Sequence, residues 1–211
     1  NKMHIGISQR IDQVVAYKEI RDALDHRLVD WVIDIGETPV PIPNSLVNIG
    51  LPINNQKNLL NWLKSMNIEA LLLSGGNDIG ESPKRDLTEK SLLSWAEKNR
   101  IPVLGICRGM QMMGVWGGAR LVSTIGHVKS RHKLQVVDGS GEWSVTVNSF
   151  HNMVLEMCPE HFRVLATSEE GNLEAMEHQT LPWEAWMWHP EREETFSFSD
   201  INRFRRLLKN E

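Results

Sequence analysis

The sequence predicts a single α/β domain, residues 1–211, with a mostly parallel central sheet and a small antiparallel extension. Two continuous apolar runs, residues 68–76 and 101–106, are each followed by a helical pattern, which is typical of buried parallel strands joined by helical crossovers. Short alternating segments separated by turn residues fill the second half. A length of 211 residues fits one hydrophobic core.

The first part of the chain alternates strand and helix patterns. Residues 4–8 predict a short strand, and apolar residues at helical spacing predict helices over residues 17–28 and 55–66. Residues 36–46 contain three prolines, so we expect a loop or at most an edge strand there. The buried strand over residues 68–76 follows and ends in a glycine pair.

The middle of the chain predicts a helix, a strand and a second helix. A helix over residues 87–98 is preceded by Asp86, a candidate cap, and Glu89 stands three residues on. The strand over residues 101–106 leads into a helix from Arg108 that stops at two glycines.

The second half is expected to extend the sheet or to form a small antiparallel layer. Its predicted strands cover residues 132–137, 143–147, 162–166, 172–177 and 183–188. Residues 199–210 predict a closing helix with one apolar face.

The composition excludes several classes of protein. Hydrophobic residues make up 41% and charged residues 24%, with a net charge of -4, so broad attraction to nucleic acid or anionic membranes is not expected. No run approaches the roughly 20 apolar residues of a membrane span, and the first residues show no signal-peptide pattern, so we expect a cytoplasmic protein. Two cysteines do not make a disulfide framework, and we expect free thiols.

Cys107 stands between Gly105 and Gly109, after an apolar strand and before a helix. This arrangement is typical of a nucleophile elbow, in which glycines remove side chains that would collide in the turn. The N–H of Arg108 would face an oxyanion, and the helix N-terminus would favour the thiolate. The alternative is a small buried residue in a tight turn, and the motif alone leaves both open. Cys158 has no such setting and is expected to be structural.

A base for this cysteine is predicted at His189, which ends an apolar strand and is followed by Pro190 and Glu191. Residues i and i+2 of an extended chain point to the same side, so Glu191 can orient the imidazole and stabilise its charged form. In isolation the segment also fits a strand end with a surface ion pair. Its place after the elbow favours a catalytic triad.

The glycine pair after residue 74 is expected to contribute backbone N–H groups, and no side chains, to a substrate site. Gly75 and Gly76 leave N–H groups free to approach a substrate, and Gly76 is the predicted second oxyanion donor. A phosphate-binding loop is excluded because the segment lacks the required lysine and hydroxyl.

Four motifs, GICRGMQ, LLLSGGND, VNSFHN and WHPE, together resemble the class I glutamine amidotransferase-like superfamily, and within it the γ-glutamyl hydrolase group, peptidase family C26. The opening IGISQR is similar to the first strand of those hydrolases. The resemblance implies a flavodoxin-like three-layer sandwich and a triad of Cys107, His189 and Glu191. It also implies an oxyanion hole from the backbone of Gly76 and Arg108.

The resemblance further implies a set of substrate contacts. The candidate substrate-binding residues are Gln111, Asn148, Ser149, Phe150, His151 and Arg10. Gln111 would help to hold the γ-glutamyl group, and a packing role is the alternative for Phe150. Arg10 and Arg108 are candidates to meet a leaving-group phosphate or the glutamyl carboxylate, with ordinary structural pairing as the alternative for Arg10.

The implied activity is hydrolysis of a γ-glutamyl amide through a thioester, with no metal and no cofactor. Two groups within the family are similar in pattern: hydrolases of γ-glutamyl-CDP-amidate in capsule polysaccharide biosynthesis, and hydrolases of γ-glutamyl-aminobutyrate. A glutaminase subunit that delivers ammonia to a separate synthase, and a non-enzymatic cysteine redox sensor, stay open. The expected partner is a small γ-glutamyl molecule, not nucleic acid or membrane, and a homodimer is left open.

Overall fold

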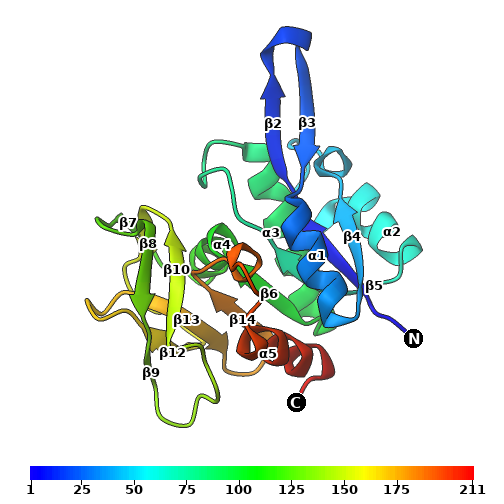
Figure 1. The fold of residues 1–211 in the computed structure, drawn as a ribbon. Helices are drawn as coiled ribbons and strands as arrows, with labels where there is room; N and C mark the ends of the chain where they lie inside the picture. Colours follow the sequence, from blue (N-terminus) through cyan, green and yellow to red (C-terminus); the bar gives the residue numbers. More distant parts are fainter.

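The structure is a computed structural model that describes residues 1–211. An eight-stranded sheet in the order β4-β1-β5-β6-β14-β13-β12-β9 forms its centre (Figure 1). The parallel part consists of β4 (Thr38–Ile42), β1 (His4–Ser8), β5 (Ile68–Leu73), β6 (Val103–Ile106) and β14 (Trp183–Trp186). The antiparallel part consists of β13 (Leu173–His178), β12 (Phe162–Thr167) and β9 (Gln135–Val136). The predicted mostly parallel sheet with an antiparallel extension is confirmed.

Helices cover both faces of the sheet and make three layers (Figure 1). Alternate residues of β5 point to opposite faces: Leu71 and Leu73 join one buried cluster, whereas Ala70 and Leu72 join the other. The first cluster takes its helical residues from α2 (Lys57–Ser65), α3 (Pro83–Asn99) and α4 (Arg108–Trp116). The second takes them from α1 (His26–Ile35) and α5 (Phe198–Lys209). This is the flavodoxin-like three-layer arrangement expected from the sequence.

Three two-stranded sheets lie outside the central sheet. They pair β2 (Arg10–Val14) with β3 (Glu19–Ala23), β8 (Val128–Lys133) with β10 (Thr146–Phe150), and β7 (Leu121–Ser123) with β11 (Met153–Leu155). Short 3-10 helices cover Val15–Tyr17, Asn44–Leu46, Ile53–Asn55 and Pro190–Arg192. The antiparallel pair of β8 and β10, here called the β8–β10 hairpin, carries most of the VNSFHN segment. None of the helices combines the length and the apolar character that crossing a membrane requires.

The helix predicted over residues 17–28 was wrong. A projecting hairpin of β2 and β3 occupies most of this range (Figure 1), with Lys18 at φ 53° in its turn. The helix α1 begins only at His26, after the side chain of Asp25 accepts a hydrogen bond from the Arg27 N–H. Ile20 is 72% exposed, so the apolar spacing that indicated a helix does not reflect a buried face.

The predicted start of α3 was also wrong. The helix begins at Pro83, whose missing N–H is harmless in the first turn. Asp86 therefore lies inside the helix, where its carboxylate accepts from the Gly80 N–H at 2.9 Å. Glu89 is fully buried. Both acidic residues make tertiary contacts rather than a capping box.

Candidate active site

Cys107 occupies the turn between β6 and α4 in a strained backbone conformation, with φ 51° and ψ −108°. Its N–H donates to the Trp186 carbonyl at 2.8 Å, which ties the turn to β14. A Cβ on Gly105 would lie 2.8 Å from the Gly109 carbonyl oxygen, and one on Gly109 would overlap the Leu73 carbonyl oxygen. Both glycines are therefore required by close backbone approach, and the turn has the features of a nucleophile elbow.

The strand β14 delivers His189 to this turn. The Nδ1 atom of His189 lies 2.7 Å from Oε1 of Glu191, and both side chains are buried. This contact fixes a proton on Nδ1 and leaves Nε2 for another partner. Cys107 lines the same cavity as His189, so the structure brings the three residues of the predicted triad together at one place.

The charge state of His189 follows from these contacts. Burial lowers the pKa of His189, but hydrogen bonds to Cys107 and Glu191, together with their negative charge, outweigh burial and raise the pKa to about 9. The ring is then an imidazolium at neutral pH.

We predict that kcat/KM for amide hydrolysis falls as the pH rises through about 9, because His189 then loses the proton that the leaving nitrogen needs. The same raised pKa stabilises the fold fully below the ordinary value of 6.5, and that contribution is lost as the pH rises through about 9. A pH–rate profile and urea unfolding across this range test both effects. A profile with no alkaline decline contradicts the assignment of His189 as proton donor.

The strand β10 holds His189 in place. The side-chain amide of Asn148 donates from Nδ2 to the His189 carbonyl at 2.8 Å, and its Oδ1 accepts from the His189 N–H at 3.0 Å. The Phe150 ring meets the His189 ring edge-on, with centroids 6.0 Å apart. The guanidinium of Arg192 lies 4.7 Å from the centroid of Phe150. Asn148 is therefore a positioning residue for the base.

The loop after β5 approaches the same ring. A Cβ on Gly75 would lie 2.6 Å from Cε1 of His189, so only glycine leaves room for the imidazole. Gly76 has φ +83° and lies against the guanidinium of Arg10. The backbone of this loop thus lies between the His189 ring and the Arg10 guanidinium.

Arg85 anchors this loop from behind. Its buried guanidinium donates to the Ser74 carbonyl at 2.9 Å, to the Ser74 hydroxyl at 3.1 Å and to the Gly76 carbonyl. Burial lowers the pKa of Arg85 to about 9, and the nearby charge of Arg10 adds to the decrease. The guanidinium still carries its charge at neutral pH. The position of the glycine pair is therefore set by a side chain that sequence analysis did not select.

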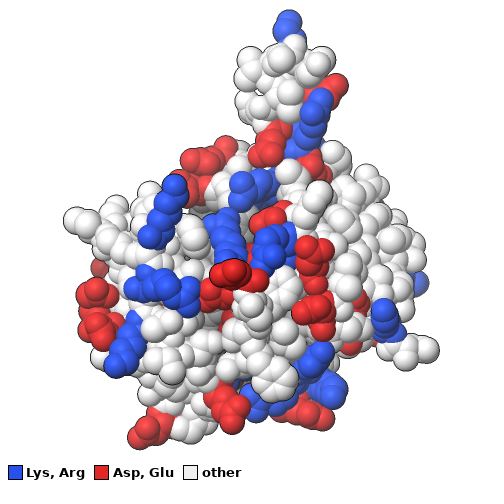
Figure 2. Space-filling view, viewed as in Figure 1, with Lys and Arg blue, Asp and Glu red and all other residues white.

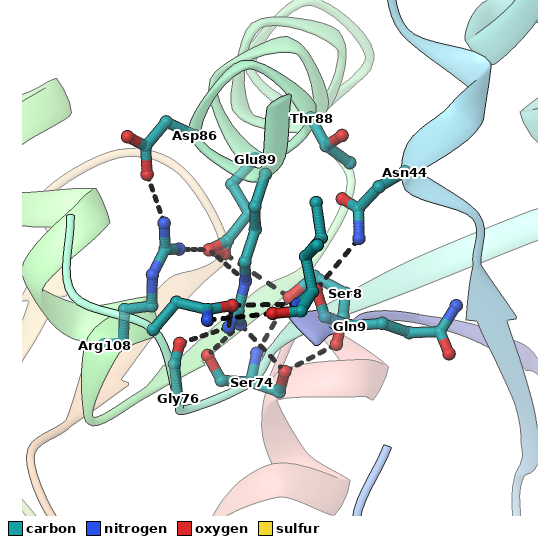
Figure 3. A network of polar contacts seen from close by, with 12 residues as sticks. Ser8, Gln9, Asn44, Ser74, Gly76, Asp86, Thr88, Glu89 and Arg108 are labelled. Atoms are coloured by element: carbon teal, nitrogen blue, oxygen red, sulfur yellow. Dashed lines mark hydrogen bonds and ion pairs between the residues drawn. The ribbon is translucent and has the colours of Figure 1, made fainter. Parts of the chain in front are cut away.

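The side chain of Arg108 also belongs to this buried layer. Its guanidinium, 2% exposed, donates to the carboxylates of Asp86 and Glu89 (Figure 3). Burial lowers the pKa of Arg108 to about 9, with the charge of Arg85 adding and Asp86 opposing. The expectation that this guanidinium meets a phosphate or the glutamyl carboxylate needs correction, because two carboxylates already neutralise it.

A polar cavity of about 200 Å³ opens at Cys107. Its lining consists of Arg10, Gly76, Asn77, Asp78, Cys107, Arg108, Gln111, Phe150, His151, Asn152, His189 and Arg192. A larger hollow of about 840 Å³ between α2 and α3 contains neither a cysteine nor a histidine, so the smaller cavity is the candidate site. Figure 2 shows basic and acidic side chains side by side across the face in view, with no extended patch of one sign.

The structure separates the predicted substrate-binding residues into two groups. Gln111, Phe150, His151 and Arg10 line the cavity, and the amide of Gln111 donates to the Met153 carbonyl at 3.2 Å. Asn148 and Ser149 lie outside the lining. The fully buried hydroxyl of Ser149 donates to the His127 carbonyl at 2.6 Å, so it serves the hairpin rather than the substrate space.

Sequence analysis missed Arg192, which lines the cavity three residues after the base. Its position directly after the WHPE motif was the available signal. It also missed that His151 belongs to a cluster with His127, His132 and Glu174.

Burial shifts the pKa values of His127, His151 and Glu174 toward their uncharged forms. Burial lowers the pKa of His151 to about 4, helped by His127, and burial raises the pKa of Glu174 to about 8. Neutral imidazoles are the form that binds metal ions. Among the described residues, this cluster has the donor set that fits a metal ion.

Comparison with known proteins identifies the family and the fold. Residues 5–191 match the family model described as Peptidase C26. The chain is 32% identical over 201 residues to the γ-glutamyl-CDP-amidate hydrolase of Campylobacter jejuni subsp. jejuni, covering 90% of this chain and 91% of that protein. It is 27% identical over 149 residues to one subunit of the glutamine-hydrolysing GMP synthase of Thermococcus kodakarensis, covering 68% of this chain and 77% of that protein. A crystal structure described as a GMP synthase subunit from Thermoplasma acidophilum shares the fold, with a TM-score of 0.72 over 100% of this chain and 96% of that chain at 23% identity.

Proposed function

The chain belongs to the peptidase C26 family of glutamine amidotransferase-like hydrolases, and on this premise we propose that it hydrolyses γ-glutamyl-CDP-amidate through a thioester on Cys107. The observation that carries the proposal is the grouping of Cys107, at its strained turn, with the buried pair of His189 and Glu191 at one cavity. Packing alone does not require a strained cysteine beside a charged imidazole. The substrate follows the relative that covers 90% of the chain.

In the proposed first step, the sulfur of Cys107 attacks the γ-carbonyl carbon, and the bond to the leaving nitrogen breaks. The imidazolium of His189 gives its proton to that nitrogen. In the second step, neutral His189 takes a proton from water, and the hydroxide attacks the thioester. Glutamate leaves, and the thiolate and imidazolium are restored. Glu191 keeps the ring in one tautomer and stabilises its charge in both steps.

The negative charge that develops on the carbonyl oxygen needs donors. We assign this role to the N–H groups of Arg108, in the first turn of α4, and of Gly76, in the loop after β5. N–H groups in a first helical turn have no intrahelical acceptor, so the Arg108 N–H is available. Both residues line the cavity with Cys107. One such donor typically contributes on the order of 3 kcal/mol to transition-state stabilisation.

The charges around the cavity support a phosphorylated leaving group. Arg10 and Arg192 both line the cavity beside His189. Neither forms an ion pair with a buried carboxylate, whereas Arg108 pairs with Asp86 and Glu89. Guanidinium groups bind phosphate oxygens through paired hydrogen bonds, which suits a CDP-amidate leaving group better than free ammonia.

We predict that Arg10→Gln and Arg192→Gln each lower kcat/KM for γ-glutamyl-CDP-amidate by about 10- to 100-fold, the usual worth of a hydrogen bond to a charged group. Turnover of glutamine, whose leaving group is uncharged ammonia, should change little. Arg163→Gln is the matched control, because Arg163 pairs with Glu177 on the exposed surface. Equal losses with both substrates would place the arginines on the glutamyl carboxylate instead.

Product analysis tests the proposed function directly. The protein is incubated separately with γ-glutamyl-CDP-amidate, γ-glutamyl-aminobutyrate and glutamine, and the products are identified by mass spectrometry. We expect glutamate and CDP-amidate from the first substrate, and no product from the Cys107→Ser variant. Release of glutamate from none of the three would overturn the proposal. Glutamine hydrolysis that rises only when a synthase is added would favour a glutaminase that serves a separate synthase, the alternative to which the GMP synthase relatives correspond.

A further inference from the structure

We propose that the chain contains a zinc site next to the catalytic triad, which fixes the hairpin that positions His189. The ligands are His127, His132, His151 and Glu174. The zinc takes no part in bond cleavage, and the proposal does not depend on which amide the enzyme hydrolyses.

The four side chains come from three separate parts of the fold. His127 directly precedes β8, His132 lies within β8, His151 directly follows β10, and Glu174 belongs to β13 of the central sheet. One ligand atom from each lies within 4.8 Å of all the others. Ligands around a tetrahedral zinc lie roughly 3.4 Å apart, so side-chain movements of about an ångström complete the site.

The candidate ligand atoms have no hydrogen-bond partner in the protein. These atoms are Nδ1 of His127, Nε2 of His132, Nε2 of His151 and both carboxylate oxygens of Glu174. Glu174, His127 and His151 are only 1%, 2% and 5% exposed. Native interiors pair the large majority of buried polar atoms, so a group of unpaired atoms facing one another indicates a bound ligand.

Hydrogen bonds on the outer side of the rings prepare them for a metal. The Nδ1 of His151 lies 3.1 Å from the Met153 carbonyl and donates to it, which leaves a lone pair on the Nε2 that faces the cluster. The Nε2 of His127 lies 3.2 Å from the Asn172 side-chain amide and 3.9 Å from the Glu170 carboxylate. Zinc on the Nδ1 of His127 requires a proton on this Nε2, so we expect the Asn172 amide to turn its oxygen toward the ring when the metal binds. Outer partners of this kind are typical of metal-binding histidines.

A hydrogen-bonded network without metal fits less well. The shortest approach of Glu174 to His127 is 4.0 Å, which is beyond hydrogen-bond distance. Three imidazoles and one carboxylate favour zinc over magnesium or calcium, which prefer oxygen ligands. Four protein ligands leave no open position, as is usual for structural zinc.

The proposed site acts on catalysis indirectly, through the hairpin that positions His189. The backbone carbonyl of His127 accepts from the Ser149 hydroxyl at 2.6 Å and from the His151 N–H at 2.9 Å. Zinc would therefore lock the β8–β10 hairpin onto β13. That hairpin carries Asn148, which holds the backbone of His189 on both sides.

Zinc binding to the full-length chain tests the proposal. The Cys107→Ser variant is used as the parent, because it removes the thiolate and imidazole pair as a competing zinc site. After treatment with a chelator, the protein is titrated with Zn²⁺ against a chromophoric competitor. We expect about one zinc ion per chain, a zinc-dependent rise in melting temperature, and visible absorption typical of tetrahedral Co²⁺ when cobalt replaces zinc.

Ligand variants and a matched control complete the test. Glu174→Gln, which keeps the side-chain shape, and His132→Asn, at a half-buried position, should each weaken zinc binding more than about 100-fold, since even outer partners contribute about 10- to 100-fold. His161→Asn, at an exposed histidine outside the cluster, should bind zinc like the parent. Circular dichroism checks that each variant is folded.

Two results would overturn the proposal: a folded parent that binds no stoichiometric zinc, or ligand variants that bind it as tightly as the parent. Zinc binding by a protein that hydrolyses no γ-glutamyl amide would leave this site standing and remove only the proposed function.

Discussion

Replacing His189 with asparagine lowers kcat/KM for the γ-glutamyl substrate by on the order of 10⁶-fold, as expected for a residue that acts as a unit with its nucleophile. Asparagine still offers an N–H to Glu191, so the buried carboxylate keeps a partner and the fold is retained. It cannot transfer a proton in either step. Steady-state kinetics measures the loss, and the melting temperature confirms that the variant is folded.

The double variant Cys107→Ala, His189→Asn sharpens this test. Because the sulfur and the imidazole act together, the double variant should lose no more activity than either single variant. His161→Asn, at an exposed position, serves as the unaffected control. If the activity loss of the double variant equals the product of the two single losses, the two residues contribute independently, which contradicts the proposed triad.

Replacing Glu89 with alanine lowers the free energy of unfolding by about 3 to 5 kcal/mol, the range expected when one partner of a buried ion pair is removed. Glu89 is fully buried and accepts from Arg108 (Figure 3). It also lies 3.8 Å from Nε of Arg85. Without it, Arg108 keeps only Asp86 as a carboxylate partner, and Arg85 loses its ion pair. Urea denaturation measures the change.

Glu97→Ala is the matched control for this prediction, because Glu97 lies on the same helix α3 but is exposed. Its effect should stay within about 0.5 kcal/mol. Hydrolysis should also fall in Glu89→Ala, since Arg85 anchors the Ser74 to Gly76 loop at the active site. A loss of stability equal to that of Glu97→Ala would mean that the buried pairs contribute nothing net.

Local patterns were sufficient to predict the centre of the fold, whereas motif order and the family resemblance joined Cys107 with His189. The apolar runs that became β5 and β6 are buried on both faces, so their sequence shows no ambiguity. The spacing of two residues between His189 and Glu191 fixed their common direction. The carboxyl ends of parallel neighbours share one edge, which brought the elbow and the base together.

Features that depend on distant partners could not be predicted. The helix predicted over residues 17–28 was wrong because Ile20 is apolar yet exposed. The spacing of apolar residues therefore gave no information on burial in this segment. The role of Arg108 depends on Asp86 and Glu89, which a helix from another part of the chain supplies. The zinc cluster likewise needs β8, β10 and β13 to be placed before its residues become neighbours.

The backbone conformation of Cys107 has an energetic cost. At φ 51° and ψ −108°, glycine would rest comfortably, whereas a residue with a side chain raises the energy of the native state by on the order of 1 to 3 kcal/mol. At this single turn the backbone conformation favours glycine, whereas the proposed chemistry requires cysteine, and the chain has cysteine.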